Sequence, residues 1–392
     1  MVNKINIKYF DYVLSILFFV LLFLRSSNFK YLVSSSVFYF LIVLINIYLL
    51  LNHKQKINKH ILFLYFICFL SWSFNYLIGT INPFFNSFER LILFFLTLNV
   101  LGPFLINKRS FQFRNRLFKT CLVFIPMCFL IDSFYIIKDR KITFGGEFNG
   151  ILESPNLAGV ICSLHIIIFI FLYLREKKLK NKILYMAISF SAFPFLFASG
   201  ARGPILSLII VLLIISFYNF KKIIPFGIII CLTGLVFYNS VYKYVEPIIN
   251  KIESRSGSGD ISTGRFSMYS DNIDDFMSNP IIGVGFYNMV HTYNSKINPD
   301  GSIEYPSGWL FVLSTTGILG FVFFINLLFK VFISFFKIRN TKFPFFLTLL
   351  ILCFFLIHSN IEGYIFSGGG MLFCIFWLTV SNFYNFYINE NS

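Results

Sequence analysis

The sequence predicts an all-α, polytopic integral membrane protein with about 12 transmembrane helices and one large periplasmic loop. First, 57% of the 392 residues are hydrophobic and only 13% are charged, and a soluble chain of this length could not cover that much apolar surface. Second, apolar runs long enough to cross a bilayer as helices recur along the whole length. Third, basic residues collect in alternate connections between these runs, whereas most acidic residues fall in the others.

The apolar runs set the expected spans. We expect them at 9–24, 31–51, 61–79, 89–106, 120–137, 155–174, 183–199, 204–219, 223–239, 307–329, 343–360 and 364–387. The stretch 183–219 reads either as one long kinked helix or as two spans. Gly200, Gly203 and Pro204 favour a turn between two spans.

The positive charges predict the orientation. Lys4, Lys8 and five basic connections all lie on one side if the spans are right; those connections are 52–60, 107–119, 175–182, 221–222 and 330–342. Basic loops stay in the cytoplasm, so both termini are expected there. The net charge of +16 then reflects loops that face anionic headgroups, so the membrane is the expected partner and nucleic acid is not. The seven cysteines fall inside apolar runs without metal-ligand spacing.

The chain divides into a bundle at 1–239, a loop at 240–306 and a second bundle at 307–392, and so long a loop is usually functional. Residues 264–277 show helical periodicity, with Thr263 as a plausible N-cap and Pro280 at the end. We expect this helix to pack its apolar residues on the membrane domain; they are Phe266, Tyr269, Ile273 and Phe276 or Met277. Its acids are expected to be solvated; they are Asp271, Asp274 and Asp275.

Two arginines stand out as candidate anion ligands. Arg202 lies in a turn of small residues between apolar runs, where a guanidinium that cannot lose its charge is costly. Arg265 lies at the start of the predicted loop helix, where the helix dipole and the free N–H groups favour an anion.

An ordered set of segments resembles the O-antigen ligase and O-antigen polymerase superfamily. The segments are ESPNLAGVICSL (153–164), LFASGARGPILSLII (196–210), STGRFSMYSDNIDDFMSNPIIGVGFYNM (262–289), YPSGWLFVLSTTGILGFVFF (305–324) and HSNIEGY (358–364). The resemblance implies an enzyme of the bacterial inner membrane that transfers a glycan from undecaprenyl pyrophosphate at the periplasmic face. It also implies that Arg202 and Arg265 hold the lipid pyrophosphate. Guanidiniums match phosphate geometry and stabilise a departing pyrophosphate, so no metal or other cofactor is expected.

One departure from the family pattern bears on the reaction. Ligases that resemble this chain carry His-Asn just before the tenth span, where this chain has Pro306 and Ser307. The difference favours a polymerase, which joins lipid-linked repeat units, over a ligase. It leaves the general base open among His291, Glu304 and Glu362.

Other candidate site residues carry open alternatives. His358 and Glu362 match a His/Glu pair common in the family, and a structural hydrogen bond at the helix end is the alternative. Asn156 either contacts sugar or caps the sixth span, and we favour the cap. Glu147 and Glu153 either contact substrate or are solvated.

Three functions follow from these observations. The first is an inverting polymerase that transfers the growing glycan to a new lipid-linked repeat, and the resemblance implies a chain-length regulator as its partner. The second is a ligase that passes the glycan to lipid A–core or to protein. The third is a lipid-linked oligosaccharide flippase, although such transporters usually show related halves and no internal repeat is visible here.

Overall fold

The computed structural model describes residues 2–51, 56–139, 148–217, 264–299, 301–338 and 343–391. The predicted span at 223–239, Thr263, Glu147 and the loop up to residue 263 lie outside the described residues. The elements are α1 (Val2–Arg25), η1 (Lys30–Leu32), α2 (Ser35–Leu51), α3 (Lys59–Leu77), η2 (Pro83–Phe85), α4 (Ser87–Leu101), α5 (Lys108–Asp139), α6 (Pro155–Arg175), α7 (Leu179–Ser191), α8 (Phe193–Ala198), α11 (Arg265–Ser278), β1 (Lys296–Ile297), β2 (Ile303–Glu304), α12 (Gly308–Ile338), α13 (Phe343–His358) and α14 (Met371–Asn391). A further apolar helix covers Arg202–Phe217.

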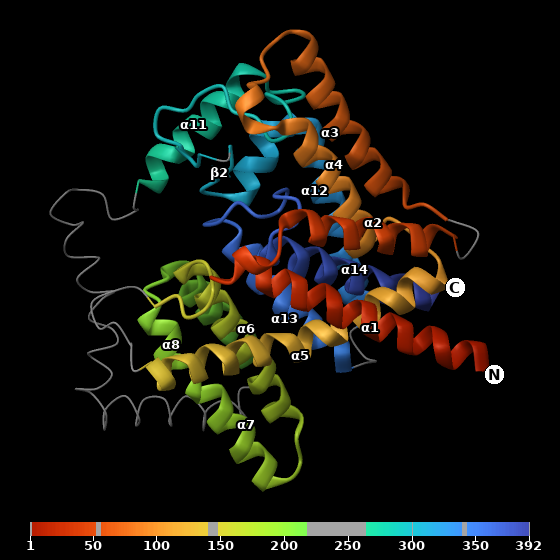
Figure 1. Ribbon diagram of the computed structural model, residues 1–392, viewed down its shortest axis with the longest axis vertical. Helices are drawn as coiled ribbons and strands as arrows, with labels where there is room; N and C mark the ends of the chain where they lie inside the picture. Colours follow the sequence, from red (N-terminus) through yellow and green to blue (C-terminus); the bar gives the residue numbers. More distant parts are fainter. Residues whose placement is uncertain are drawn as a thin grey trace, which may run out of the picture.

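The described part of the chain is helical apart from one short antiparallel hairpin, in which β1 pairs with β2. Six of its helical segments are long and apolar enough to cross a membrane; they are Lys59–Leu77, Pro83–Leu101, Lys108–Phe134, Pro155–Arg175, Leu179–Ala198 and Gly308–Ile333. Four shorter apolar helices accompany them. This architecture fits a polytopic membrane protein, while the number of spans and their orientation stay predictions. The two chain ends lie on the same side of the molecule (Figure 1).

Two predicted boundaries are wrong, each for a local reason. The basic segment 107–119 was expected to be a connecting loop, but α5 begins at Lys108, and Asn107 caps it by accepting from the Ser110 N–H. The last span was expected to begin at 364, but α14 begins at Met371. Gly368 and Gly369 have φ of 57° and 104°, left-handed values that end regular helix, so they belong to the preceding turn.

Gly317 kinks α12. Its φ of 63° and ψ of −169° are not helical. The chain after α11 docks at this kink, where the N–H of Ile318 donates to the carbonyl of Pro280 over 2.8 Å. A Cβ atom at Gly317 would lie 2.3 Å from the carbonyl oxygen of Ile281, so only glycine fits.

Three segments far apart in the sequence meet beside this kinked helix. α12 packs against α11, α3 and α14, and α13 packs against α6 and α14. Helix α11 and β2 lie together on one side of the molecule (Figure 1). The N-terminal end of α6, the turn between α13 and α14, and α11 all contribute to the candidate site.

Candidate functional site

The centre of the candidate site is the turn that joins α13 to α14, residues 359–370. Backbone hydrogen bonds fix this turn to the segment before α12: the N–H of Gly308 donates to Ser359 over 2.7 Å and the N–H of Gly363 donates to Tyr305 over 2.9 Å. A Cβ atom at Gly363 would lie 2.2 Å from that of Tyr305, so glycine is required for this approach. Glu362 is therefore held on a well-fixed backbone.

The carboxylate of Glu362 is anchored through one of its two oxygens. Oε1 accepts a hydrogen bond from Nη2 of Arg265 over 3.0 Å and another from Nδ2 of Asn156 over 2.5 Å. Among the described residues, no hydrogen bond is made to Oε2. The side chain is 20% exposed, so the second oxygen is accessible from the cavity described below.

Two opposing effects act on the acidity of Glu362. Burial raises the pKa of Glu362 above its ordinary value, because a charged carboxylate loses its hydration. The positive charge and hydrogen bond of Arg265 oppose this rise in pKa, as does the hydrogen bond of Asn156, whereas the nearby Glu304 adds to it. The net direction is upward, which makes Glu362 a stronger base than an exposed glutamate.

A cavity of about 470 Å³ opens beside Glu362. Its wall includes Glu362, Asn156 and Glu304, which are three of the predicted site residues. Glu304 comes from β2, and its carboxylate is 3.9 Å from Nζ of Lys296 on the paired strand. The cavity also has polar groups at Glu153, Ser154, Asn298 and Ser367. A partly polar cleft of this size can hold a small polar ligand.

Arg265 reaches Glu362 because α11 begins beside the turn. Gly264 precedes the helix with φ of 75°, and Arg265 is its first residue. A second contact supports the docking, because the hydroxyl of Tyr269 donates to the carbonyl of Asn360 over 2.9 Å. The structure thus brings Arg265, Glu362 and Asn156 together from three elements.

Arg202 begins the helix Arg202–Phe217 next to the same turn. A Cβ atom at the following residue, Gly203, would lie 3.3 Å from Ile361 and 3.4 Å from the His358 ring. On the other side, a Cβ atom at Gly159 of α6 would lie 3.0 Å from that of Ala201. The backbone of Arg202 therefore lies between the start of α6 and the residue adjoining Glu362.

His358 and Glu362 do not act as a side-chain pair. Helix α13 ends at His358, so Glu362 leaves the helical face; the two residues share only the hydrogen bond from the Glu362 N–H to the His358 carbonyl, at 3.2 Å. The His358 ring is fully buried between the rings of Phe354 and Tyr364, both with centroids 5.7 Å away. Neither ring nitrogen has a hydrogen-bond partner in the described part of the chain. His358 thus packs behind the turn rather than lining the cavity.

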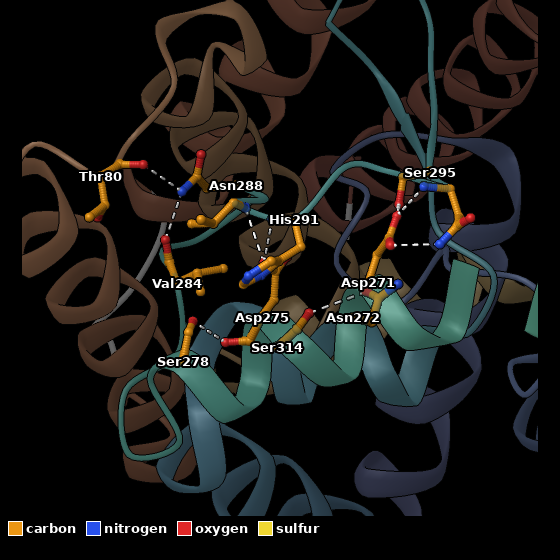
Figure 2. Close-up of polar contacts among 12 residues, drawn as sticks. Thr80, Asp271, Asn272, Asp275, Ser278, Val284, Asn288, His291, Ser295 and Ser314 are labelled. Atoms are coloured by element: carbon orange, nitrogen blue, oxygen red, sulfur yellow. Dashed lines mark hydrogen bonds and ion pairs between the residues drawn. The ribbon is translucent and has the colours of Figure 1, made fainter. Parts of the chain in front are cut away.

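His291 lies at the other end of α11, away from Arg265. Its ring Nδ1 is 2.9 Å from Oδ1 of Asp275, and the same oxygen accepts the backbone N–H groups of Val290 and His291 (Figure 2). Asp271 also accepts a backbone hydrogen bond, from the N–H of Asn294 over 2.8 Å. These bonds fix the segment after the helix, and His291 is not among the residues that line the cavity.

The expectations about the faces of α11 are corrected by this arrangement. Asp271 and Asp275 were expected to be solvated, but both are buried because they satisfy backbone N–H groups. Asp274 is exposed, as expected. The apolar side chains were expected to pack inward, yet Phe266, Ile273 and Met277 are exposed. The buried residues of α11 recur at helical spacing, and this spacing is the signal in the sequence that could have revealed the buried face; the residues are Met268, Asp271, Asn272 and Asp275.

Asn156 is not the cap of α6, contrary to the favoured expectation. Ser154 caps this helix, because its Oγ accepts the N–H of Leu157 over 3.2 Å. Asn156 in the first turn is thereby free to donate to Glu362. Glu153 also lines the cavity, where it pairs with Lys30 at 2.7 Å.

Residues 186–325 match the family model described as O-antigen ligase. The matched segment runs from within α7 to within α12, so it includes Arg202, Arg265 and Glu304, whereas Asn156 and Glu362 lie outside it. Among curated proteins, no match to the chain was found. The match covers about a third of the chain and supports a membrane enzyme that handles glycans.

Proposed function

We propose, from the match of residues 186–325 to the O-antigen ligase family model and from the site geometry, that this chain is a polymerase of lipid-linked oligosaccharide repeat units. The donor is the growing glycan on undecaprenyl pyrophosphate. The acceptor is a hydroxyl on the terminal sugar of a new lipid-linked repeat. The reaction takes place at the periplasmic face of the bacterial inner membrane, with both chain termini in the cytoplasm.

The observation that carries this proposal is the anchored carboxylate of Glu362 beside the cavity. Oε1 is held by Arg265 and Asn156, and Oε2 is available to accept a proton. In the reaction, the acceptor hydroxyl oxygen attacks the anomeric carbon and its proton passes to Oε2 of Glu362. The bond from the anomeric carbon to the phosphate oxygen breaks, and its electron pair leaves with the pyrophosphate. One such displacement inverts the anomeric configuration.

The two arginines are assigned to the pyrophosphate. Arg265 and Arg202 each begin a helix beside the turn that carries Glu362, where free N–H groups add to the guanidinium charge. Charge grows on the leaving group as the glycosidic bond breaks, so fixed cations stabilise the transition state more than the ground state. This use of arginine in place of a metal requires no cofactor.

The departure at Pro306–Ser307 supports Glu362 as the base. Ligases that resemble this chain carry His-Asn here, whereas this chain has Pro306, whose side chain has no proton acceptor, and Ser307, which is buried and whose Oγ accepts the N–H of Leu310 over 3.4 Å at the start of α12. The backbone of 305–308 lies directly against that of 359–363. Glu362 thus supplies a proton acceptor beside the position where the ligases carry theirs.

A ligase is the second candidate, because the matched family model is described as O-antigen ligase. Glycan profiling of a deletion strain separates the two. Loss of a polymerase leaves single repeats attached at the surface, whereas loss of a ligase removes attachment altogether. Only the first result supports the polymerase.

Elongation by the purified protein tests the proposal directly. The full chain in detergent, supplied with lipid-linked repeats and no membrane gradient, should produce a ladder of longer glycans. A protein that bound the repeats without extending them would contradict the proposal and would favour a flippase. A chain-length regulator, added as a partner, should narrow the ladder.

A further inference from the structure

Helix α11 places its polar residues inward and its apolar residues outward. Asp271, Asn272 and Asp275 are buried against the protein, and Ser314 of α12 donates to Asn272 over 3.4 Å (Figure 2). On the opposite side, Phe266 is 74% exposed and Met277 is 69% exposed. An inverted helix of this kind has an apolar face that the rest of the described chain does not cover.

The exposed side of α11 is itself divided into two sectors. At 100° per residue, Phe266, Ile273 and Met277 fall on one line along the helix, with Tyr269 and Phe276 at its flank. Ser267 and Asp274 fall on another line, about 80–100° around the helix from Phe266, and are also exposed. The helix thus has a protein-facing polar sector, an apolar sector and a water-facing polar sector, which is the pattern of a helix that lies at a membrane surface.

The apolar sector continues into the apolar surface of a candidate membrane span. After α11, the exposed Ile281 follows, and its carbonyl accepts the N–H of Leu319 at the kink of α12 over 3.3 Å. From this kink, exposed apolar side chains run along α12 at helical spacing; they are Ile318, Val322, Ile325 and Phe329. They belong to Gly308–Ile333, a segment long and apolar enough to cross a membrane.

We propose that α11 lies in the membrane surface, with Phe266, Ile273 and Met277 in contact with the acyl chains of the leaflet next to the Arg265–Glu362 pair. The continuous apolar surface with α12 selects lipid as the occupant over a second protein. Because Arg265 is the first residue of α11, this position holds its guanidinium at the depth of lipid phosphate groups. The inference concerns position in the membrane and does not depend on the reaction proposed above.

Site-directed fluorescence on the full chain in phospholipid nanodiscs tests this position. Single cysteines at Ile273 and Met277 report the apolar sector, and Ser267→Cys and Asp274→Cys are matched controls in the water-facing sector of the same helix. Each variant is labelled with a polarity-sensitive bimane. The unsubstituted protein is the labelling blank, because five native cysteines of the described chain are buried and Cys353 is half-buried.

The expected result is a split between the two sectors. Labels at 273 and 277 should show blue-shifted emission and loss of intensity with brominated lipid, whereas labels at 267 and 274 should be quenched by aqueous iodide. Iodide quenching at all four positions would overturn the proposal, because the apolar sector would then face water. Protection from both quenchers at 273 and 277 would also overturn it, because a protein partner would then cover the sector. A label at Phe266→Cys repeats the test should either variant fail to fold.

Discussion

Nη2 of Arg265 lies 3.0 Å from Oε1 of Glu362 and joins helix α11 to the turn between α13 and α14. Both side chains are 20% exposed, so this ion pair is shielded from bulk water yet open to a ligand. The pair fixes the orientation of the Glu362 carboxylate. It also leaves the Arg265 guanidinium able to bind a second anion, the pyrophosphate of the proposed donor.

Replacing Glu362, the proposed base, should lower the rate of the chemical step more than the affinity for substrate. Glu362→Gln keeps the shape and the hydrogen bond from Asn156 but cannot accept a proton. We expect kcat for elongation to fall by about 10²–10⁴-fold, the usual contribution of general base catalysis, with a small change in KM. Glu304→Gln is the matched control, because it lines the same cavity from β2 and should lose far less. A larger loss for Glu304→Gln would transfer the role of base to that residue.

Replacing the arginines should abolish elongation without loss of folded protein. Arg265→Ala and Arg202→Ala each remove a cation from the pyrophosphate, and Arg→Lys should also be poor because a point charge replaces a planar fork. The measurement is glycan length produced by detergent-purified variants that retain the elution profile of the parent. Normal chain lengths from either alanine variant would count against the assignment. Activity should survive EDTA, since the guanidiniums take the place of a metal.

The pH dependence of kcat/KM should report Glu362. A base must be ionised to act, so the rate falls as the pH drops through its pKa. Burial raises the pKa of Glu362, so the acid limb should lie above the ordinary glutamate pKa of about 4.3. Asn156→Ala removes a hydrogen bond that opposes this rise in pKa, so its acid limb should move to still higher pH. An acid limb that stayed in place in Asn156→Ala would show that another group is titrating.

The buried carboxylate of Asp275 should matter for stability. Asp275→Ala removes the acceptor of the Val290 and His291 N–H groups, and each lost hydrogen bond costs about 0.5–1.5 kcal/mol. We expect a clearly lower thermal midpoint for the purified variant. Asp274→Ala, one residue away on the exposed side of α11, should leave the midpoint unchanged. Equal midpoints for the two variants would mean that this network does not support the fold.

Alanine substitutions at two glycines with the same φ angle distinguish the cost of backbone strain from the cost of a steric clash. Gly79 and Gly283 both have φ of 75°, so alanine is strained by about 1–2 kcal/mol at either position. A Cβ atom at Gly79 meets nothing within 4 Å, whereas one at Gly283 would lie 2.4 Å from the backbone of Thr315. Gly283→Ala should therefore lower the thermal midpoint much more than Gly79→Ala. Similar losses would show that the return of the chain onto α12 is not tightly packed.

The sequence predicted the helical membrane class and most of the helices, because composition and apolar run length depend on the solvent and not on the partners of each helix. Its placement of Arg265 at a helix start was also confirmed, although the N-cap is Gly264, without a side-chain hydrogen bond, rather than Thr263. Glu304, Glu362 and His291 could not be ranked in this way. Only the packing of α6, α11 and the α13–α14 turn brings Arg265 and Asn156 to Glu362.

The sequence by itself determined that residues 264–277 form an amphipathic helix, and the tertiary structure decided which face lies inward. Hydrophobic periodicity locates an apolar face of a helix. That face packs against the protein where the surroundings are water, but it can stay outside where the surroundings are lipid. In α11, the carboxylates of Asp271 and Asp275 accept backbone N–H groups of the segment after the helix, so the polar face turns to the protein. That choice depends on long-range hydrogen bonds between segments, which a local pattern does not contain.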